Sequence, residues 1–287
     1  MTVSLVTDST TYIPQEARDQ YGIEVASLYI NDGDSHEREA DMDYHAFYER
    51  LKDMAVLPKS AQPSPETLQE MFLRIVERGD EVLAVFLSSE MSGTVQSAHM
   101  VADMIRSTHP EAQICIIDSE TNSMQEGYAV LAGAQAAQSG ATLDECAQAV
   151  RDTMARSRFI FAPQSLEYLK RGGRIGRASA LLGSLIKLVP ILTVENAVTT
   201  TFAKVRTYPR ALATMRDKMM EDAQAAGGFK NICLHYICDK KLAEDFQREF
   251  IEPALGHTVD LIAIGPVIGT HVGPAVGIVY ETVEPLR

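Results

Sequence analysis

The sequence predicts an α/β fold, with a parallel sheet and flanking helices in the first part of the chain and a mixed sheet in the second. Up to about residue 158, short apolar runs alternate with helical patterns, the order that right-handed crossovers between parallel strands require. After Phe159 the pattern changes, because two strand patterns meet at a short turn. The 287 residues are 46% hydrophobic, which suits one or two domains. We therefore expect two α/β domains, residues 1–158 and 159–287, with residues 59–78 able to pack with the second.

Caps and apolar runs predict the elements of the first part. Pro14 suits the first turn of a helix, Ser64 and Pro65 give a cap and a helix start, and Thr142 to Glu145 form a capping box. Residues 31–43 are acidic and are expected to form a surface loop. The expected strands are Ser4–Thr7, Ile23–Ile30, Val82–Leu87 and Ile114–Ile117, and the expected helices include Met42–Met54 and one from Pro65 through Glu77.

The second part begins with a predicted hairpin, in which Ile191–Val194 and Val198–Val205 flank a turn of three residues. A helical pattern over Pro209–Ala225 ends at a Gly-Gly pair, which suits a helix C-terminus. The segment from Gly265 to Pro274 is rich in Gly and Pro and is expected to be a rigid turn that presents His271. Further strands are expected over Ile232–Ile237, Leu261–Ile264 and Gly277–Tyr280.

Composition and charge argue against several classes of protein. The net charge of −13 disfavours nucleic acid or an anionic membrane as the main partner. The first residues lack the regions of a signal peptide, and the most apolar stretch, Ala178–Val194, contains Lys187 and Pro190 and falls short of a membrane span. The four cysteines show no C-x-x-C spacing and fit reduced core thiols. We expect a cytoplasmic protein without stable membrane insertion.

Motifs for nucleotide, redox and metal chemistry are missing. The sequence contains no phosphate-binding P-loop, no G-x-G-x-x-G dinucleotide turn and no G-x-S-x-G nucleophile elbow. The seven histidines show neither H-x-x-x-H spacing nor a cluster with acidic residues that suits a metal. We therefore expect no cofactor and no metal ion.

The most informative segment is Val82–Ala98, where an apolar strand leads through a loop rich in hydroxyl groups into a helix. Backbone N–H groups at such a helix start attract anions, Gly93 permits close approach to the backbone, and Ser92 can add a hydroxyl donor. The loop has no Lys or Arg, and Glu90 would repel a dianion, which favours a carboxylate over a phosphate. The alternative interpretation is that Ser92 only caps the helix.

Two further features have both a functional and a purely structural interpretation. His271 stands among apolar residues and could donate a hydrogen bond to a carboxylate, or it could be a core histidine bonded to the backbone. The Leu166–Arg177 segment contains a basic cluster in an acidic chain. That cluster could dock an acidic partner or its phosphorylated ligand, or it could be a solvated helix end whose cations favour the C-terminal dipole.

Taken together, the motifs of this chain resemble the DegV family, in order from the first strand to the last. They are Val6 to Thr10, Ser60-Ala61-Gln62-Pro63-Ser64, Ser88–Ser97, Leu166–Ile175 with Ala180 to Gly183, Pro190 to Leu192, and Ile268 to Pro274. The resemblance implies a two-domain cytosolic fatty-acid-binding protein with the ligand between its domains. It also implies, for some members, an acyl-binding subunit that presents a fatty acid to a separate ATP-using kinase subunit.

The resemblance also implies a site for the fatty acid carboxylate. The Ser-Gly pair of the family falls on Ser92 and Gly93, and its C-terminal histidine falls on His271. Ser60 stands where the family commonly has Thr, and Ala61 lacks the next hydroxyl, a departure that could change chain preference. The basic segment of the family falls on Arg171–Arg174, so Arg171 and Arg174 are expected to dock the kinase subunit. An apolar tunnel could be lined by the 181–191 region, with Leu182, Leu185 and Ile186.

The resulting hypothesis is a non-catalytic carrier that holds a long-chain fatty acid and presents it for acyl phosphate formation. One alternative is a serine-type lipid hydrolase or acyltransferase, with Ser92 as nucleophile and His271 as base, which requires the two side chains within hydrogen-bond reach. The other alternative is a lipid sensor with the same pocket and no kinase partner.

Overall fold

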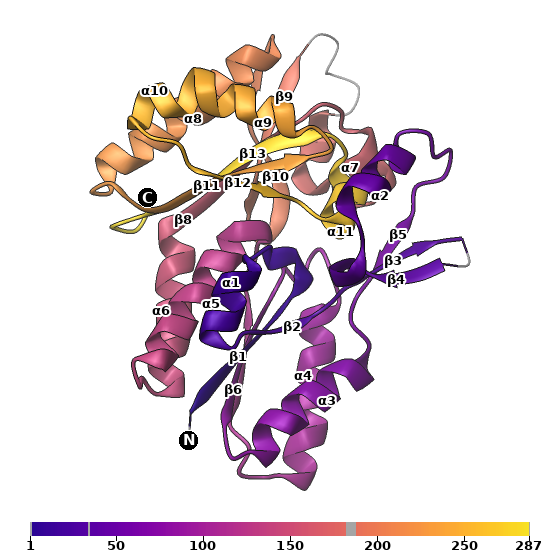
Figure 1. Ribbon diagram of the computed structural model, residues 1–287, viewed down its shortest axis with the longest axis vertical. Coiled ribbons are helices and arrows are strands. Elements are labelled where there is room, and N and C mark those ends of the chain that lie inside the picture. Colours follow the sequence, from indigo (N-terminus) through magenta and orange to yellow (C-terminus); the bar gives the residue numbers. More distant parts are fainter. Residues whose placement is uncertain (1, 34, 182–187, 287) are drawn as a thin grey trace.

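A computed structural model describes residues 2–33, 35–181 and 188–286, and shows two main sheets, one above the other in Figure 1. The lower sheet has four parallel strands in the order β2-β1-β6-β7. The upper sheet has six strands in the order β10-β9-β8-β13-β11-β12, of which only β11 and β12 pair in parallel within the described residues. The predicted α/β class, with one parallel and one mixed sheet, is confirmed.

Helices cover both faces of the parallel sheet, α3 and α4 on one side and α5 and α6 on the other (Figure 1). This double cover explains why its strands are continuous apolar runs, as in β6, where Val82 to Phe86 are all buried. The elements are β1 (Val3–Asp8), α1 (Gln15–Tyr21), β2 (Glu24–Ala26), α3 (Pro65–Glu77), β6 (Glu81–Phe86), α4 (Thr94–Thr108), β7 (Ile114–Asp118), α5 (Ser123–Gln138) and α6 (Leu143–Arg156).

The predicted caps are confirmed at two helices. Ser64 Oγ accepts a hydrogen bond from the Thr67 amide at the start of α3, and Thr142 with Glu145 forms a complete capping box on α6. Both are local arrangements of side chain and backbone, which a sequence motif can specify without knowledge of the tertiary structure.

The expected single strand Ile23–Ile30 is wrong, because this stretch divides between two sheets. β2 ends at Ala26, and β3 (Tyr29–Asp32) begins a separate antiparallel sheet with β4 (Ser35–Arg38) and β5 (Lys59–Ala61). The expected surface loop at residues 31–43 is also wrong in part, since it contains this hairpin and the fully buried Glu39. The remaining elements of this region are a 3-10 turn (Glu39–Asp41) and α2 (Tyr44–Leu51).

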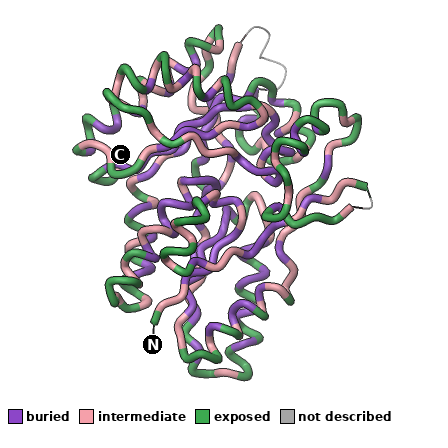
Figure 2. Tube along the Cα trace, in the orientation of Figure 1, coloured by how far each residue is buried: buried purple, intermediate pink, exposed green. Residues whose placement is uncertain are grey.

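The two faces of the six-stranded sheet pack against different parts of the molecule. On β8, Phe159 and Phe161 face the parallel sheet, whereas Ile160 and Ala162 pack with residues of α8 on the outer side. Figure 2 shows buried backbone running through both sheets. The elements are β8 (Ser157–Pro163), α7 (Glu167–Arg171), a 3-10 helix (Gly176–Leu181), β9 (Val189–Glu195), β10 (Val198–Val205), α8 (Tyr208–Ala225), β11 (Phe229–Ile237), α9 (Lys240–Phe246), a π-helical turn (Gln247–Ile251), α10 (Glu252–Leu255), β12 (Asp260–Ala263), α11 (Pro266–Val272) and β13 (Ala275–Thr282).

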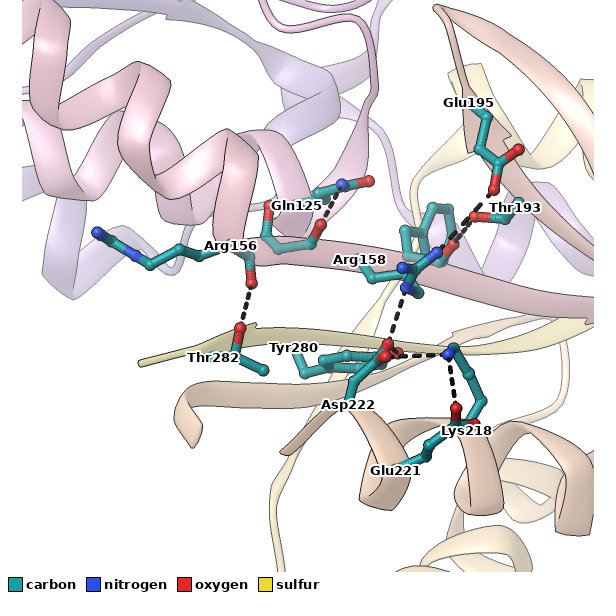
Figure 3. Close-up of polar contacts among 12 residues, drawn as sticks. Gln125, Arg156, Arg158, Thr193, Glu195, Lys218, Glu221, Asp222, Tyr280 and Thr282 are labelled. Atoms are coloured by element: carbon teal, nitrogen blue, oxygen red, sulfur yellow. Dashed lines mark hydrogen bonds and ion pairs between the residues drawn. The ribbon is translucent and has the colours of Figure 1, made fainter. Parts of the chain in front are cut away.

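The predicted hairpin is confirmed, because β9 and β10 pair antiparallel around Asn196 and Ala197. A polar cluster then fixes α8 to the outer face of the sheet (Figure 3). Asp222 of α8 accepts hydrogen bonds from Arg158 Nε at 2.9 Å and from the Tyr280 hydroxyl at 2.7 Å. Because Asp222 is almost fully buried, these charge-assisted bonds satisfy a group that would otherwise destabilise the fold.

The expected rigid turn at residues 265–274 is instead the short helix α11. Pro266 occupies its first turn and Gly273, with φ of +68°, ends it, so the signals of a helix were present in the Gly- and Pro-rich pattern. β5 and α11 are in contact, whereas α3, which follows β5, packs on α4 and β6.

Three other predictions concern the cysteines, membrane-spanning helices and the proposed tunnel residues. All four cysteines are free thiols. No helix within the described residues has both the length and the apolar character that a membrane crossing needs. The residues suggested for a tunnel, Leu182, Leu185 and Ile186, lie outside the described residues.

Candidate functional site

A cavity of about 310 Å³ lies between the inner face of the six-stranded sheet and the loops that follow β6 and β7. This volume is in the range of small-molecule binding sites. The apolar lining comes from the six-stranded sheet, from α7 and α11, and from the segments that follow β2 and β6. Most of it is buried: Leu28, Leu87, Phe159, Phe161, Leu169, Val194, Ile237, Ile264, Val267 and Ala275. The site is therefore built by parts of the chain that are far apart in sequence.

Polar groups gather at one wall of this cavity. Ser60 on β5 and His271 on α11 are joined by a hydrogen bond of 2.7 Å between Ser60 Oγ and His271 Nε2. Ser92 and Gly93 line the same cavity from the loop after β6. All four of these residues are half-buried, in contrast to the buried apolar lining, so the polar wall is the side nearer to solvent.

Ser92 does not cap the helix that follows it. The N-cap of α4 is Gly93, and no side chain caps this helix; Ser92 Oγ instead bonds Thr94 Oγ1 at 2.9 Å. The interpretation of Ser92 as a helix cap is therefore wrong. Its hydroxyl stands at the cavity wall with the start of α4 beside it, where the first amides of a helix favour negative charge.

The side chain of Gln62 packs directly against Gly93 at the start of α4. A Cβ atom at this position would lie 2.2 Å from Gln62 Oε1. Gln62 also lines the cavity, and its Nε2 donates to Ser97 Oγ at 2.6 Å. The absence of a side chain at Gly93 thus lets the Gln62 amide lie across the start of α4.

Burial, and next the positive charge of Arg174, lowers the pKa of His271 to about 4. The imidazole is therefore neutral at pH 7 and bonds to Ser60 as a neutral group. Its Nδ1 has no hydrogen-bond partner among the described residues and lies against the backbone of Gly172, where a Cβ atom would be only 2.3 Å away. His271 is thus bonded to a cavity side chain and not to the backbone, in contrast to the core-histidine interpretation.

The two arginines suggested for partner docking lie in different surroundings. Arg174 lines the cavity, and its Nε donates to the Met91 carbonyl at 3.1 Å, next to Ser92. Arg171 is the last residue of α7, and its guanidinium donates to the Ala55 carbonyl at 2.9 Å. Both are exposed, so Arg174 places a cation where the polar wall of the cavity meets solvent.

The cavity residues that sequence reasoning missed include Gln62, Asn122 and His235, and Arg174 was expected only to dock a partner. Gln62 stands in the Ser60–Ser64 motif and Asn122 follows a strand, which was a usable signal. His235 has none, because it is one residue of an apolar strand; its ring nitrogens lie 3.2 Å from the Met124 amide and 3.1 Å from the Ile262 carbonyl. Burial lowers the pKa of His235 to about 4.

The helix that carries His271 is held by side chains of the first part of the chain. Glu39 Oε1 accepts from the Val267 amide at 2.8 Å, and the Tyr48 hydroxyl donates to the carbonyls of Ile264 and Gly265 at 2.7 and 2.8 Å. Gly269 allows this contact, because a Cβ there would lie 2.1 Å from the Tyr48 hydroxyl oxygen. The position of His271 therefore depends on both parts of the chain.

This arrangement suits binding of a monoanion with an apolar tail. Hydroxyl groups, a neutral imidazole and one arginine at the mouth can surround a carboxylate, and most of the remaining lining is apolar. An acyl-transfer triad is less well matched, since Ser92 bonds Thr94 and His271 Nδ1 has no orienting partner among the described residues.

Comparison with known proteins settles the family. A family model described as an uncharacterised protein of the DegV family matches residues 2–283. The chain belongs to the DegV family. A DegV domain-containing protein of Clostridium acetobutylicum is 42% identical over 293 residues, which cover 100% of both chains. Protein DegV of Bacillus subtilis is 30% identical over 286 residues, which cover 98% of this chain and 99% of that protein.

Solved DegV structures share the fold over nearly the whole chain. A DegV family protein from Thermus thermophilus, described with fatty acid binding, matches with a TM-score of 0.84 and 28% identity over 98% of this chain and all of the other. DegV of Bacillus subtilis, described as a fatty acid binding protein, matches with a TM-score of 0.83 and 30% identity over 98% and 99%.

Proposed function

We propose that this DegV protein binds one long-chain fatty acid in the cavity, with the carboxylate held at Ser60, Ser92, Gly93 and His271. The observation that carries this proposal is the division of the cavity between a half-buried polar wall and a buried apolar lining. Fatty acid binding described for the Thermus and Bacillus relatives supports it.

The two parts of the cavity would contribute differently to binding. Each buried methylene contributes about 0.8 kcal/mol, so a chain of roughly fifteen methylenes gives on the order of 12 kcal/mol before the costs of ordering. Apolar burial therefore dominates the affinity. The polar wall sets the orientation of the ligand and discriminates free acids from esters, because an ester lacks the charge that strengthens these hydrogen bonds.

The protein would act as a non-catalytic cytoplasmic carrier that presents the carboxylate to a separate kinase subunit. Arg174 supports this step, because it places a positive charge at the exposed end of the polar wall, where acyl phosphate would gain negative charge. Arg171 lies on the same short segment, at the end of α7, and its charge would face an approaching partner.

Calorimetric titration with hexadecanoate and its methyl ester tests the binding site. We expect the wild-type protein to prefer the acid, and Ser92→Ala and His271→Ala each to weaken acid binding by roughly 1.5–3 kcal/mol, since each loses a hydrogen bond to a charged group. Ser107→Ala is the matched control, because Ser107 is an exposed serine of α4, the helix that follows the Ser92 loop. Equal affinity for acid and ester in the wild type would remove the carboxylate from this wall.

A further inference from the structure

Asn122 is a buried polar residue of the cavity that the site described above does not use. It lies between β7 and α5, lines the cavity and is only 7% exposed. Its Nδ2 contacts Met91 Sδ at 3.4 Å, and its Oδ1 has no hydrogen-bond partner among the described residues. An amide oxygen buried without a donor is costly, and a thioether is a weak partner for the amide nitrogen.

The side chain does not serve the local fold. Asn122 occupies the N-cap position of α5 but makes no side-chain cap hydrogen bond. Its neighbours do form local bonds, since Thr121 Oγ1 donates to Gln125 Oε1 of α5 and Ser123 Oγ donates to the Asn122 carbonyl. Glu120 and Ser123 both have positive φ, of 53° and 55°, so the loop holds Asn122 in place at some conformational cost.

Contacts place the Asn122 amide near the carboxylate end of the cavity. Met91, whose sulfur contacts Asn122, directly precedes Ser92, and its carbonyl accepts the hydrogen bond from Arg174. The loops that carry Asn122 and Ser92 are also joined by a backbone bond of 2.8 Å from the Ser88 amide to the Thr121 carbonyl. A ligand whose carboxylate lies at Ser92 would therefore pass Asn122 with its first carbons.

We propose that Asn122 selects fatty acids that carry a hydroxyl group near the carboxyl end. A hydroxyl group both donates and accepts, so it pairs with the Asn122 amide whichever way the amide is oriented. A plain saturated chain would leave that amide unpaired in the same place. This inference rests on the proposed fatty acid site and names the subclass of acid that the site takes.

Binding of four acids to the intact protein tests this inference: hexadecanoate and its 2-hydroxy, 3-hydroxy and 16-hydroxy derivatives. We expect the 2-hydroxy or the 3-hydroxy acid to bind at least about fivefold more tightly than hexadecanoate, the ratio expected for one buried hydrogen bond. The 16-hydroxy acid has its hydroxyl at the far end and should show no gain.

Asn122→Leu should abolish the preference and bind hexadecanoate at least as tightly as the wild type, which also shows that the variant is folded. Gln135→Leu, which removes an exposed amide of α5 outside the cavity, should keep the preference. Equal binding of all four acids by the wild type would overturn the inference and would mean that the amide holds only a water molecule. A preference that survives in Asn122→Leu would also overturn it, because another group would then recognise the hydroxyl. If no acid binds at all, the proposed function itself fails.

Discussion

At the scale of single residues, the backbone of Gly172 determines where the His271 ring lies. The ring Nδ1 lies so close to Gly172 that any side chain there would displace it, and Gly172 has an ordinary φ of −74°, so alanine is acceptable to the backbone. The imidazole is thus positioned between Gly172 and the Ser60 hydroxyl.

Gly172→Ala should therefore weaken fatty acid binding through His271. We expect a loss of roughly 1.5–3 kcal/mol, similar to the loss of one hydrogen bond to a charged group. Calorimetry on a double-mutant cycle with His271→Ala checks the cause, because the two losses should not add when they act on the same ring. Additive losses would show that Gly172 acts on the site by another route.

The sequence indicated some residues of the candidate site and not others. Ser92, Gly93 and His271 could be named because they stand in recognisable sequence motifs, and the structure brings them to one cavity with Ser60. Asn122 and His235 could not be given a role, because nothing in a sequence shows whether a buried side chain has a partner. That depends on atoms from other elements, such as Met91 Sδ for Asn122.

At the scale of elements, the main feature is the attachment of α11 to the first part of the chain through Glu39. Burial raises the pKa of the Glu39 carboxyl from 4.5 to about 7, although hydrogen bonds from Ser9, the Val267 amide and Tyr12 oppose the shift. Between about pH 4.5 and 7, the folded state therefore holds a proton that the unfolded state has lost. Stability from this group falls as the pH rises through this window.

Glu39→Gln should remove this dependence, because glutamine keeps an acceptor for the Val267 amide and carries no charge. Relative to the wild type, we expect the variant to gain up to about 3 kcal/mol of unfolding free energy as the pH rises from 4.5 to 7.5. Urea denaturation at a series of pH values measures this difference. His235 and His271, whose lowered pKa values cost stability as the pH falls from 6.5 to about 4, are common to both proteins and cancel.

The control for this experiment is Glu70→Gln, which changes an exposed carboxylate of α3. Its difference from the wild type should stay nearly constant over the same pH range. A constant difference for Glu39→Gln as well would mean that the buried carboxyl does not hold the extra proton.

Elements set by local signals could be predicted from the sequence, and elements set by tertiary contacts could not. The start of α3 and the capping box of α6 depend on side chains that bond their own backbone. The division of Ile23–Ile30 depends on which sheet each half joins, and the position of α11 depends on contacts with Glu39 and Tyr48 from the other part of the chain. Neither contact is visible in the local pattern.

At the scale of the whole molecule, two exposed arginines lie near the polar wall of the cavity in different surroundings. Arg174 lines the cavity, whereas Arg171 lies at the end of α7 and bonds the Ala55 carbonyl. A charge change at Arg174 should affect the ligand directly, and a change at Arg171 should affect mainly an approaching partner.

Arg171→Glu should lower acyl phosphate formation with a fatty acid kinase subunit and leave hexadecanoate affinity nearly unchanged. Arg174→Glu should lower both, because it places a negative charge beside the carboxylate. Turnover at several salt concentrations, with titration of the isolated protein, separates the two effects. Arg210→Glu, a reversal at an exposed arginine on α8, is the matched control. Loss of hexadecanoate binding in Arg171→Glu would assign that residue to the pocket or the fold.

The proposed function requires that the cavity hold one long-chain fatty acid. The most direct test is native mass spectrometry of the purified protein, followed by extraction and identification of the bound molecule. We expect an added mass of one long-chain acid per chain, which organic extraction removes and added acid restores. A protein that carries no lipid and binds none of the free acids from C12 to C20 would contradict it.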